Sequence, residues 1–151
     1  MIFLDKKEDI TPDIPDGLIE KAALIALKHQ VAPQNADLTI VLTDDAQLHE
    51  LNLQWMGVDA PTDVLSFPSD EIDPETGNPY LGDILISLQR AAQQAEAAGH
   101  SVEAETQLLI VHGALHLLGH DHADQEDKAK MWQAQGEILT QLNLGNIQIR
   151  E

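Results

Sequence analysis

Hydrophobic positions recur along the chain with two different periods, which predict strands and helices in turn. Short apolar, β-branched runs at residues 1–4, 38–42, 62–67 and 80–87 have the length and composition of strands. Helical spacing of apolar residues appears at 17–28, from Asp44 or Asp45 to near Gly57, and at 88–98, 102–118 and 123–142. A last strand is possible at 146–150.

This order of elements predicts an α+β fold, with a small mixed sheet of about four strands packed with about five helices. The 151 residues are enough for one hydrophobic core and too few to expect two, so we expect a single domain over residues 1–151. The segment 102–118 is apolar around most of its circumference. We therefore expect that helix to lie in the centre of the core.

Four of the seven histidines lie within HGALHLLGHDH, residues 112–122. His112 and His116 are one helical turn apart and so share a face of the predicted helix. Gly119 suits the left-handed residue that ends many helices, and the reversed chain can bring His122 back to that face. This is the ligand spacing of the metzincin zinc site, H-x-x-x-H-x-x-G-x-x-H.

Three neutral imidazoles leave one position of a tetrahedral zinc ion open, which is typical of catalytic sites. We therefore predict one zinc ion per chain, bound by His112, His116 and His122 on the central helix and the turn after it. The alternative is a pair of core histidines followed by a solvated turn.

The turn also contains His120 and Asp121, which are candidates for the general base or for the outer shell of the metal. The ring of His120 could instead point to solvent, and Asp121 could bond the backbone of the turn. Metalloproteases of this spacing use a glutamate directly after the first histidine as general base, but here that residue is Gly113. Glycine cannot accept a proton, so Gly113 is expected to allow close packing or close approach of a substrate.

The charge is strongly acidic, with 26 Asp and Glu against 8 Lys and Arg and a net charge of −18. Such a surface favours solubility and repels polyanions, so a nucleic-acid function needs a local basic patch, a metal or a partner. The chain has no cysteine, which excludes thiolate ligands and fits a reducing cytoplasm. It has neither an apolar run of about 18 residues nor a signal-peptide pattern, so we expect a cytoplasmic protein with no membrane segment.

HGALHLLGHDH, together with PTDVLSFP at 61–68 and LGDILIS at 81–87, resembles the YbeY family of single-strand endoribonucleases. The resemblance implies an α+β fold with the metal in a cleft and zinc ligands at His112, His116 and His122. It also implies a single-stranded or ribosomal RNA substrate rather than DNA. The implied role is maturation of the 3′ end of the small-subunit RNA and ribosome quality control, in association with the small subunit and its proteins.

The chain departs from the family pattern at Met56, where the family usually has an arginine suited to clamping phosphate. That clamp is therefore absent, or is replaced by another base such as Arg90, Lys6 or Lys7. Asp63 and Asp83 are candidates to line the cleft or to support the metal site.

Three functions are in competition. The first is a zinc-dependent endoribonuclease, and the second is a zinc metallopeptidase-like hydrolase. The third is a ribosome-assembly factor with little catalytic activity, which the acidic surface and Met56 favour. A concentrated basic patch beside the histidines would favour RNA handling over the third function.

Overall fold

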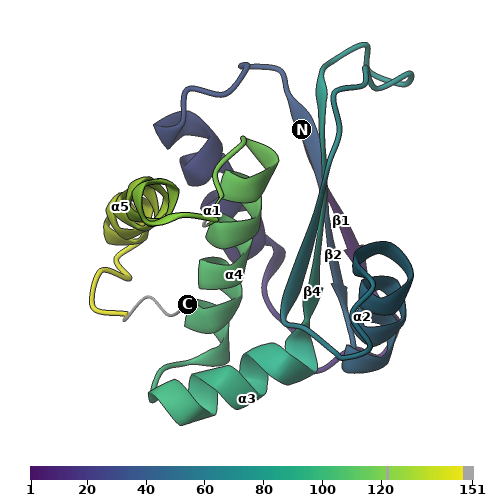
Figure 1. Ribbon diagram of the computed structural model, residues 1–151, viewed down its shortest axis with the longest axis vertical. Coiled ribbons are helices and arrows are strands. Elements are labelled where there is room, and N and C mark those ends of the chain that lie inside the picture. Colours follow the sequence, from purple (N-terminus) through teal and green to yellow (C-terminus); the bar gives the residue numbers. More distant parts are fainter. Residues whose placement is uncertain (122, 148–151) are drawn as a thin grey trace.

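The computed structural model describes residues 1–121 and 123–147. Within them the chain forms four strands, five α-helices and one short π-helical segment, arranged as in Figure 1. In chain order these are β1 (Ile2–Lys6), α1 (Asp16–His29), β2 (Asp37–Thr43), α2 (Asp45–Leu51), η1 (Asn52–Met56), β3 (Val64–Pro68), β4 (Tyr80–Ser87), α3 (Leu88–Ala98), α4 (Val102–Leu117) and α5 (Gln125–Gln141).

The sheet has the strand order β1-β2-β4-β3. The first three strands in this order are parallel, and β3 pairs antiparallel with β4, so the sheet is mixed. Because side chains alternate along a strand, Leu38, Ile40 and Leu42 of β2 face one side and are buried there. Helices α1, α4 and α5 cover that side, and α2 lies on the other (Figure 1).

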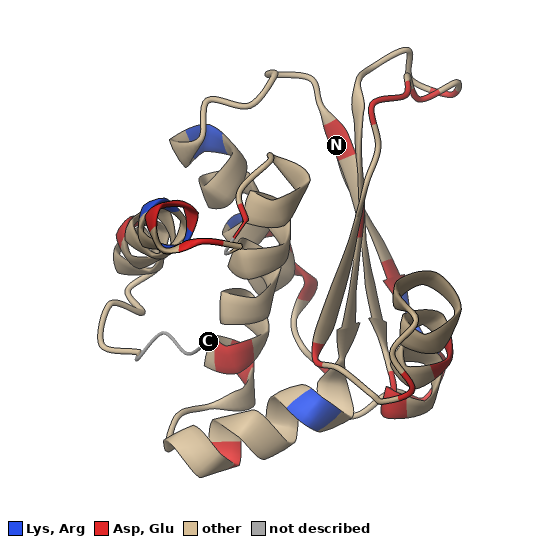
Figure 2. Cartoon of the chain, viewed as in Figure 1, with Lys and Arg blue, Asp and Glu red and all other residues tan. Residues whose placement is uncertain are grey.

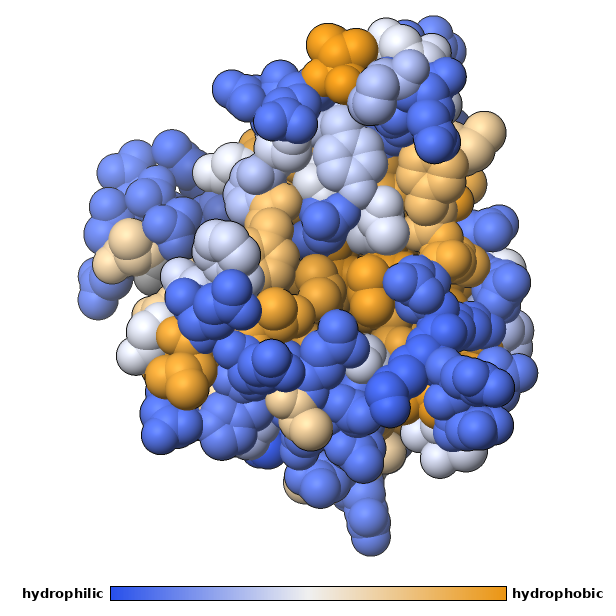
Figure 3. Space-filling view, turned by 90° about the vertical axis from the view of Figure 1, so that its right-hand side faces the viewer, coloured by the Kyte–Doolittle hydropathy of each residue, from blue (hydrophilic) through white to orange (hydrophobic). Residues whose placement is uncertain are grey.

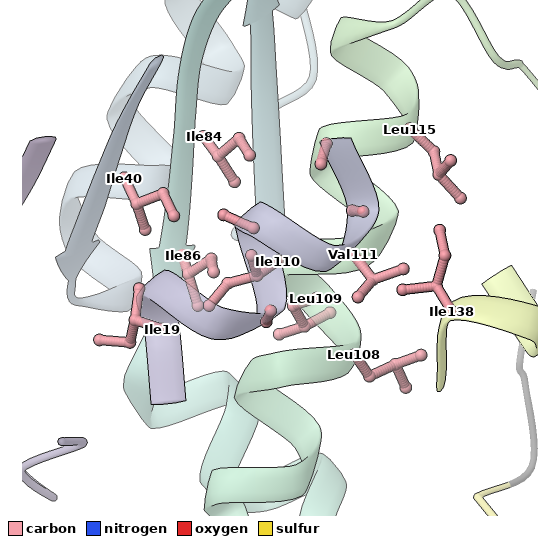
Figure 4. Close-up of a cluster of buried hydrophobic side chains, with 14 of the residues drawn as sticks. Ile19, Ile40, Ile84, Ile86, Leu108, Leu109, Ile110, Val111, Leu115 and Ile138 are labelled. Carbon is pink, nitrogen blue, oxygen red and sulfur yellow. The ribbon is translucent and has the colours of Figure 1, made fainter. Parts of the chain in front are cut away.

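The main core surrounds α4. Apolar side chains from α1, β2, β4 and α5 meet those of α4, as Figure 4 shows for Ile19, Ile40, Ile84 and Ile138. Twelve of the sixteen residues of α4 are buried, which confirms the prediction of a central helix. A smaller cluster of Leu48, Leu65 and Leu85 fills the space under α2 on the opposite face. Apolar side chains gather in the middle of that face and are bordered by hydrophilic ones (Figure 3).

Two glycines allow the backbone to approach closely where the layers meet. A Cβ atom on Gly113 of α4 would lie 2.7 Å from Cγ2 of Ile84, so α4 packs against β4 with no room for a side chain. Gly82 of β4 has a φ of +132°, and a Cβ atom there would lie 2.2 Å from the backbone oxygen of Phe67. The prediction that Gly113 serves close packing is therefore confirmed.

The predicted α+β fold with four strands and five helices is confirmed; several boundaries shift by one or two residues, and three differences have a visible cause or consequence. β3 begins at Val64 rather than at 62, because the Asp63 carboxylate accepts a hydrogen bond from the Val64 backbone N–H at 2.8 Å. The helix after Asp44 ends at Leu51 and continues as the π-helical segment to Met56, where Gly57 ends it with a φ of 71°. Of the predicted strand at 146–150, residues 146 and 147 lie in a turn, and 148–150 lie outside the described residues.

No helix within residues 1–121 and 123–147 is long and apolar enough to span a membrane.

Candidate metal centre and substrate cleft

A cleft of about 1000 Å³ runs between α4 on one side and β3 on the other. Its helical wall carries the polar residues His112, His116 and Gln135, and its strand wall includes Val64, Leu65 and Pro68. Residues from η1, α3, α5 and the turn after α4 close its ends. The volume is in the range of small-molecule and nucleotide sites.

The rings of His112 and His116 lie next to each other on α4, along the helical wall of this cleft. Their Nε2 atoms are 3.1 Å apart, and both side chains are half-buried. Nδ1 of His112 lies 3.0 Å from Oε1 of Gln135, and Nδ1 of His116 lies 3.0 Å from the backbone oxygen of His120. Both oxygens are acceptors, so in each ring it is Nδ1 that donates a proton. In the neutral rings the two Nε2 atoms therefore present lone pairs to the same point.

This donor set fits a divalent cation such as zinc. Two nitrogens bound to one tetrahedral ion at about 2.0–2.1 Å are about 3.3 Å apart, close to the observed separation. Two lone pairs held this close repel each other unless a proton or a metal ion lies between them. Within residues 1–121 and 123–147 no group of three metal-ligating side chains comes together. The predicted third ligand, His122, lies outside the described residues.

Gln135 of α5 is a functional residue that the sequence reasoning missed. It is only 1% exposed, and its amide oxygen accepts the hydrogen bond from His112. When Nδ1 of a metal-binding histidine donates to an acceptor, that hydrogen bond fixes the tautomer and the orientation of the ring. The sequence feature that could have revealed Gln135 is its position as a polar residue on the apolar face of a helix, between Met131 and Ile138, which are both buried.

His120 lies in the turn after α4 and is held from α1. Its Nε2 is 2.7 Å from Oε1 of Gln30, while its backbone oxygen accepts from His116. Both His120 and Asp121 line the cleft, and Asp121 is exposed; their role as general base or outer shell stays a prediction. The ring of His120 bonds to α1, so its clearest contribution is to hold the turn that orients His116. Gln30 continues this chain of hydrogen bonds to Nδ1 of His29, at 2.9 Å.

The strand wall mixes apolar and polar residues. Met56 and Asp63 line it, and the hydroxyl of Ser66 donates to the backbone oxygen of Gly113 at 3.3 Å, tying the two walls together. The expectation that Asp63 lines the cleft is confirmed.

Asp83 lies elsewhere, on the face of the sheet opposite α4, so its expected place in the cleft is wrong. There it accepts a hydrogen bond from the hydroxyl of Tyr80, which also bonds to Thr39. Asp83 pairs across the sheet with Thr39 and Phe67, and strand alternation gives these residues the same orientation. Burial and the bond to Asp83 raise the pKa of Tyr80 to about 12.

The expected substitute bases do not reach the cleft. Arg90 pairs with Asp45, Lys6 with Asp13 and Asp16, and Lys7 with Asp44. Figure 2 shows acidic residues on most elements, and in this view the basic residues of the described part of the chain lie scattered rather than in one patch. Of the described residues that line the cleft, Lys128 of α5 is the sole lysine or arginine.

Glu105 also lines the cleft, and its carboxylate is paired with a histidine. Glu105 of α4 is fully buried, and its Oε1 lies 2.6 Å from Nε2 of His100. Two imidazoles aimed at one point, an exposed carboxylate at Asp121 and a cleft of about 1000 Å³ together suit metal-assisted hydrolysis.

Comparison with known proteins identifies the family. The family model described as Endoribonuclease YbeY matches residues 3–143. A protein named Endoribonuclease YbeY from Pelotomaculum thermopropionicum is 47% identical over 131 residues, covering 85% of this chain and 86% of that protein. One of the same name from Acetivibrio thermocellus is 39% identical over 158 residues, covering 95% and 97%.

A solution structure of a Thermotoga maritima protein has the same fold. Its TM-score is 0.58 with 26% sequence identity, and the match covers 100% of this chain and 97% of the other. The family match spans His112, His116, the turn after α4 and the strands from residue 3 onward. The chain belongs to the YbeY family of endoribonucleases, a family of hydrolytic nucleases.

Proposed function

We propose that residues 1–151 form one metal-dependent hydrolase domain, a zinc-dependent endoribonuclease specific for single-stranded RNA. Its proposed role is maturation of the 3′ end of the small-subunit ribosomal RNA, and ribosome quality control, in the cytoplasm with the small subunit and its proteins. The observation that carries the proposal is the pair of Nε2 atoms of His112 and His116, 3.1 Å apart in the cleft. Family membership supports RNA as the substrate.

His112, His116 and, by the sequence prediction, His122 would hold the metal. When bound, the ion would polarise a phosphoryl oxygen and lower the pKa of a bound water toward about 7. Gln135 and the His120 backbone oxygen keep both Nδ1 atoms protonated, so that each Nε2 remains a donor to the metal. One zinc ion per chain follows from this single set of histidines.

Asp121 is the proposed general base, because its carboxylate is exposed and lines the cleft in the same turn. His120 is proposed as a positioning residue, since its ring bonds to Gln30 and its backbone oxygen holds His116.

A second function, ribosome-assembly factor with little catalytic activity, is favoured by one observation. Lys128 is the sole lysine or arginine among the described lining residues, so the cleft has little positive charge with which to hold RNA. The metallopeptidase alternative has no such support, because Gly113 replaces its glutamate base and packs against Ile84.

The test uses zinc-loaded protein and end-labelled single-stranded RNA. We expect cleavage that a chelator abolishes and that His116→Ala reduces to the level of the metal-free protein, with metal content measured on the same samples. His49→Ala is the matched control, because His49 lies outside the cleft and pairs with Asp59. Full cleavage by His116→Ala would exclude the metal mechanism. Metal binding without RNA cleavage would favour the assembly factor, and chelator-sensitive cleavage of casein would favour the peptidase.

A further inference from the structure

The cleft poses an electrostatic problem for the function proposed above. A single-stranded RNA carries one negative charge per nucleotide, and this chain has a net charge of −18. Asp63, Glu105 and Asp121 line the cleft, and the usual arginine is replaced by Met56. Some group beside the metal must therefore contact the phosphates and bases.

Two side chains of α5 are placed to do this. Lys128 and Trp132 both line the cleft and are one helical turn apart, with Nζ of Lys128 5.7 Å from the centre of the Trp132 ring. The Trp132 ring is in turn 6.1 Å from the ring of His112, at an interplanar angle of 78°. A cation, an indole and a metal-binding imidazole thus follow one another along one wall.

Both side chains are half-buried, so their positions are constrained. Trp132 packs against the main core, which fixes its ring at the wall, and the aliphatic stem of Lys128 is partly covered. An indole held in this way offers a surface for a nucleobase without a large loss of side-chain entropy. Stacking of a base on an aromatic ring contributes about 1–3 kcal/mol and tolerates any base.

We propose that Lys128 and Trp132 form a nucleotide-binding subsite beside the metal, in which Lys128 contacts a phosphate of single-stranded RNA and Trp132 stacks with a base. The subsite rests on the proposed endoribonuclease function and takes over the role of the arginine that Met56 replaces. It requires no sequence preference, because neither contact reads the edge of a base.

A purely structural role for the pair is the competing explanation. A lysine over a tryptophan at i, i+4 stabilises a helix surface by itself. The neighbouring Lys130 makes such a local contact, with Glu126 at 3.5 Å, and does not line the cleft. Lys130→Gln therefore removes the same charge from the same helix and is the matched control for Lys128→Gln.

The first experiment measures steady-state RNA cleavage by zinc-loaded protein at several salt concentrations. Lys128→Gln is expected to raise KM, with little change in kcat, and to reduce the slope of log(1/KM) against log[salt] by about 0.7 per lost phosphate contact. Lys130→Gln should leave the slope unchanged. Equal slopes for Lys128→Gln and the unchanged protein would overturn the phosphate contact.

The second experiment follows Trp132 directly. The chain has two tryptophans, so Trp55→Phe leaves Trp132 as the sole indole. Its fluorescence should be quenched when metal-free protein is titrated with a short single-stranded RNA. Trp132→Leu should weaken binding of labelled RNA about 5- to 150-fold, and Trp132→Phe should restore most of it. Thermal melts of each variant separate lost binding from lost folding.

The outcomes distinguish this subsite from the function it rests on. Cleavage that is unchanged in Lys128→Gln and in folded Trp132→Leu overturns the subsite and leaves the endoribonuclease in place. RNA binding that quenches Trp132 without any cleavage supports the subsite and removes the catalytic proposal. Absence of both quenching and cleavage overturns the two together.

Discussion

The two walls of the cleft differ in chemistry although they are in direct contact. The helical wall, made by α4 and α5, carries His112, His116 and Gln135, and a hydrogen bond from Nδ1 orients each histidine ring. The strand wall combines Val64 and Pro68 with the polar Asp63 and Ser66, and among the described lining residues no histidine lies on it. The helical wall is organised by hydrogen bonds to ring nitrogens, and the strand wall by close backbone packing.

Substitutions on the two walls should therefore affect different properties of the protein. A substitution on the helical wall should change metal and RNA binding while the fold survives, because the polar residues there are oriented one by one. A substitution at the packed boundary of the strand wall should change stability first, because no side chain fits there. The predictions below test this separation, beginning with the largest expected effect.

Gly82→Ala should be the most disruptive change. The new Cβ would lie 2.2 Å from the Phe67 backbone oxygen, at a φ of +132° that side chains rarely adopt. Steric overlap and backbone strain together should lower the free energy of unfolding by about 3 kcal/mol or more, measured by urea denaturation. Gly17→Ala is the control, because a Cβ atom there meets nothing within 4 Å. Equal stability of both variants would contradict the close packing of the strand wall.

Gln135→Met should weaken zinc binding about 10- to 100-fold, measured by competition with a chelator. The change keeps the shape of the side chain but removes the oxygen that accepts from His112. Gln135→Glu retains an acceptor and should recover most of the affinity, and Gln133→Met is the control on the exposed face of α5. Imidazole ¹⁵N shifts in the metal-free protein report the tautomer of His112 separately. If Gln135→Met alters neither the affinity nor these shifts, Gln135 has no positioning role.

Gly113→Ala tests the contact between the walls. Its Cβ would meet Cγ2 of Ile84 at 2.7 Å and Oγ of Ser66 at 3.1 Å, which are side-chain atoms that can shift. Overpacking costs about 1–3 kcal/mol, and the better helix propensity of alanine returns about 1 kcal/mol. We expect a net loss of about 0–2 kcal/mol in the free energy of unfolding. A stabilised variant would mean that the walls can separate freely.

The smallest expected effect is at Tyr80, the single tyrosine of the chain and the first residue of β4. Burial, followed by the bond to Asp83, raises its pKa to about 12, so the neutral phenol is favoured in the folded state. Its contribution to stability is therefore complete below the ordinary pKa of about 10 and is lost as the pH rises through about 12. Absorbance of the phenolate should titrate near this value, and Asp83→Asn should lower it. An unchanged midpoint in Asp83→Asn would remove Asp83 as a cause.

The periodic elements could be predicted from sequence because each depends on local spacing. The apolar circumference of α4 predicted a buried central helix, and twelve buried residues confirm it. The predicted boundaries were wrong where another interaction outweighed the local apolar pattern. Asp63 bonds the Val64 backbone N–H and delays β3, and η1 extends α2 with a different helical period.

The candidate site likewise has one part that local spacing predicts and another part that it does not. The spacing of His112 and His116 determined that they share a face, because four residues make about one helical turn. Gln135, which bonds the His112 ring, comes from α5, and Gln30, which bonds the His120 ring, follows α1; no local pattern joins either residue to the histidines. The ligand role of His122 stays a prediction.

By itself the sequence determined the order of the elements, the central helix, the paired histidines and the absence of a glutamate at Gly113. The tertiary structure alone decided that Asp83 faces away from the cleft, that Arg90, Lys6 and Lys7 are paired elsewhere, and that Lys128 and Trp132 stand beside His112. The physical reason is that helix and strand periods are local properties of the chain. The neighbours of a side chain across the cleft depend instead on how α4, α5 and the sheet pack together.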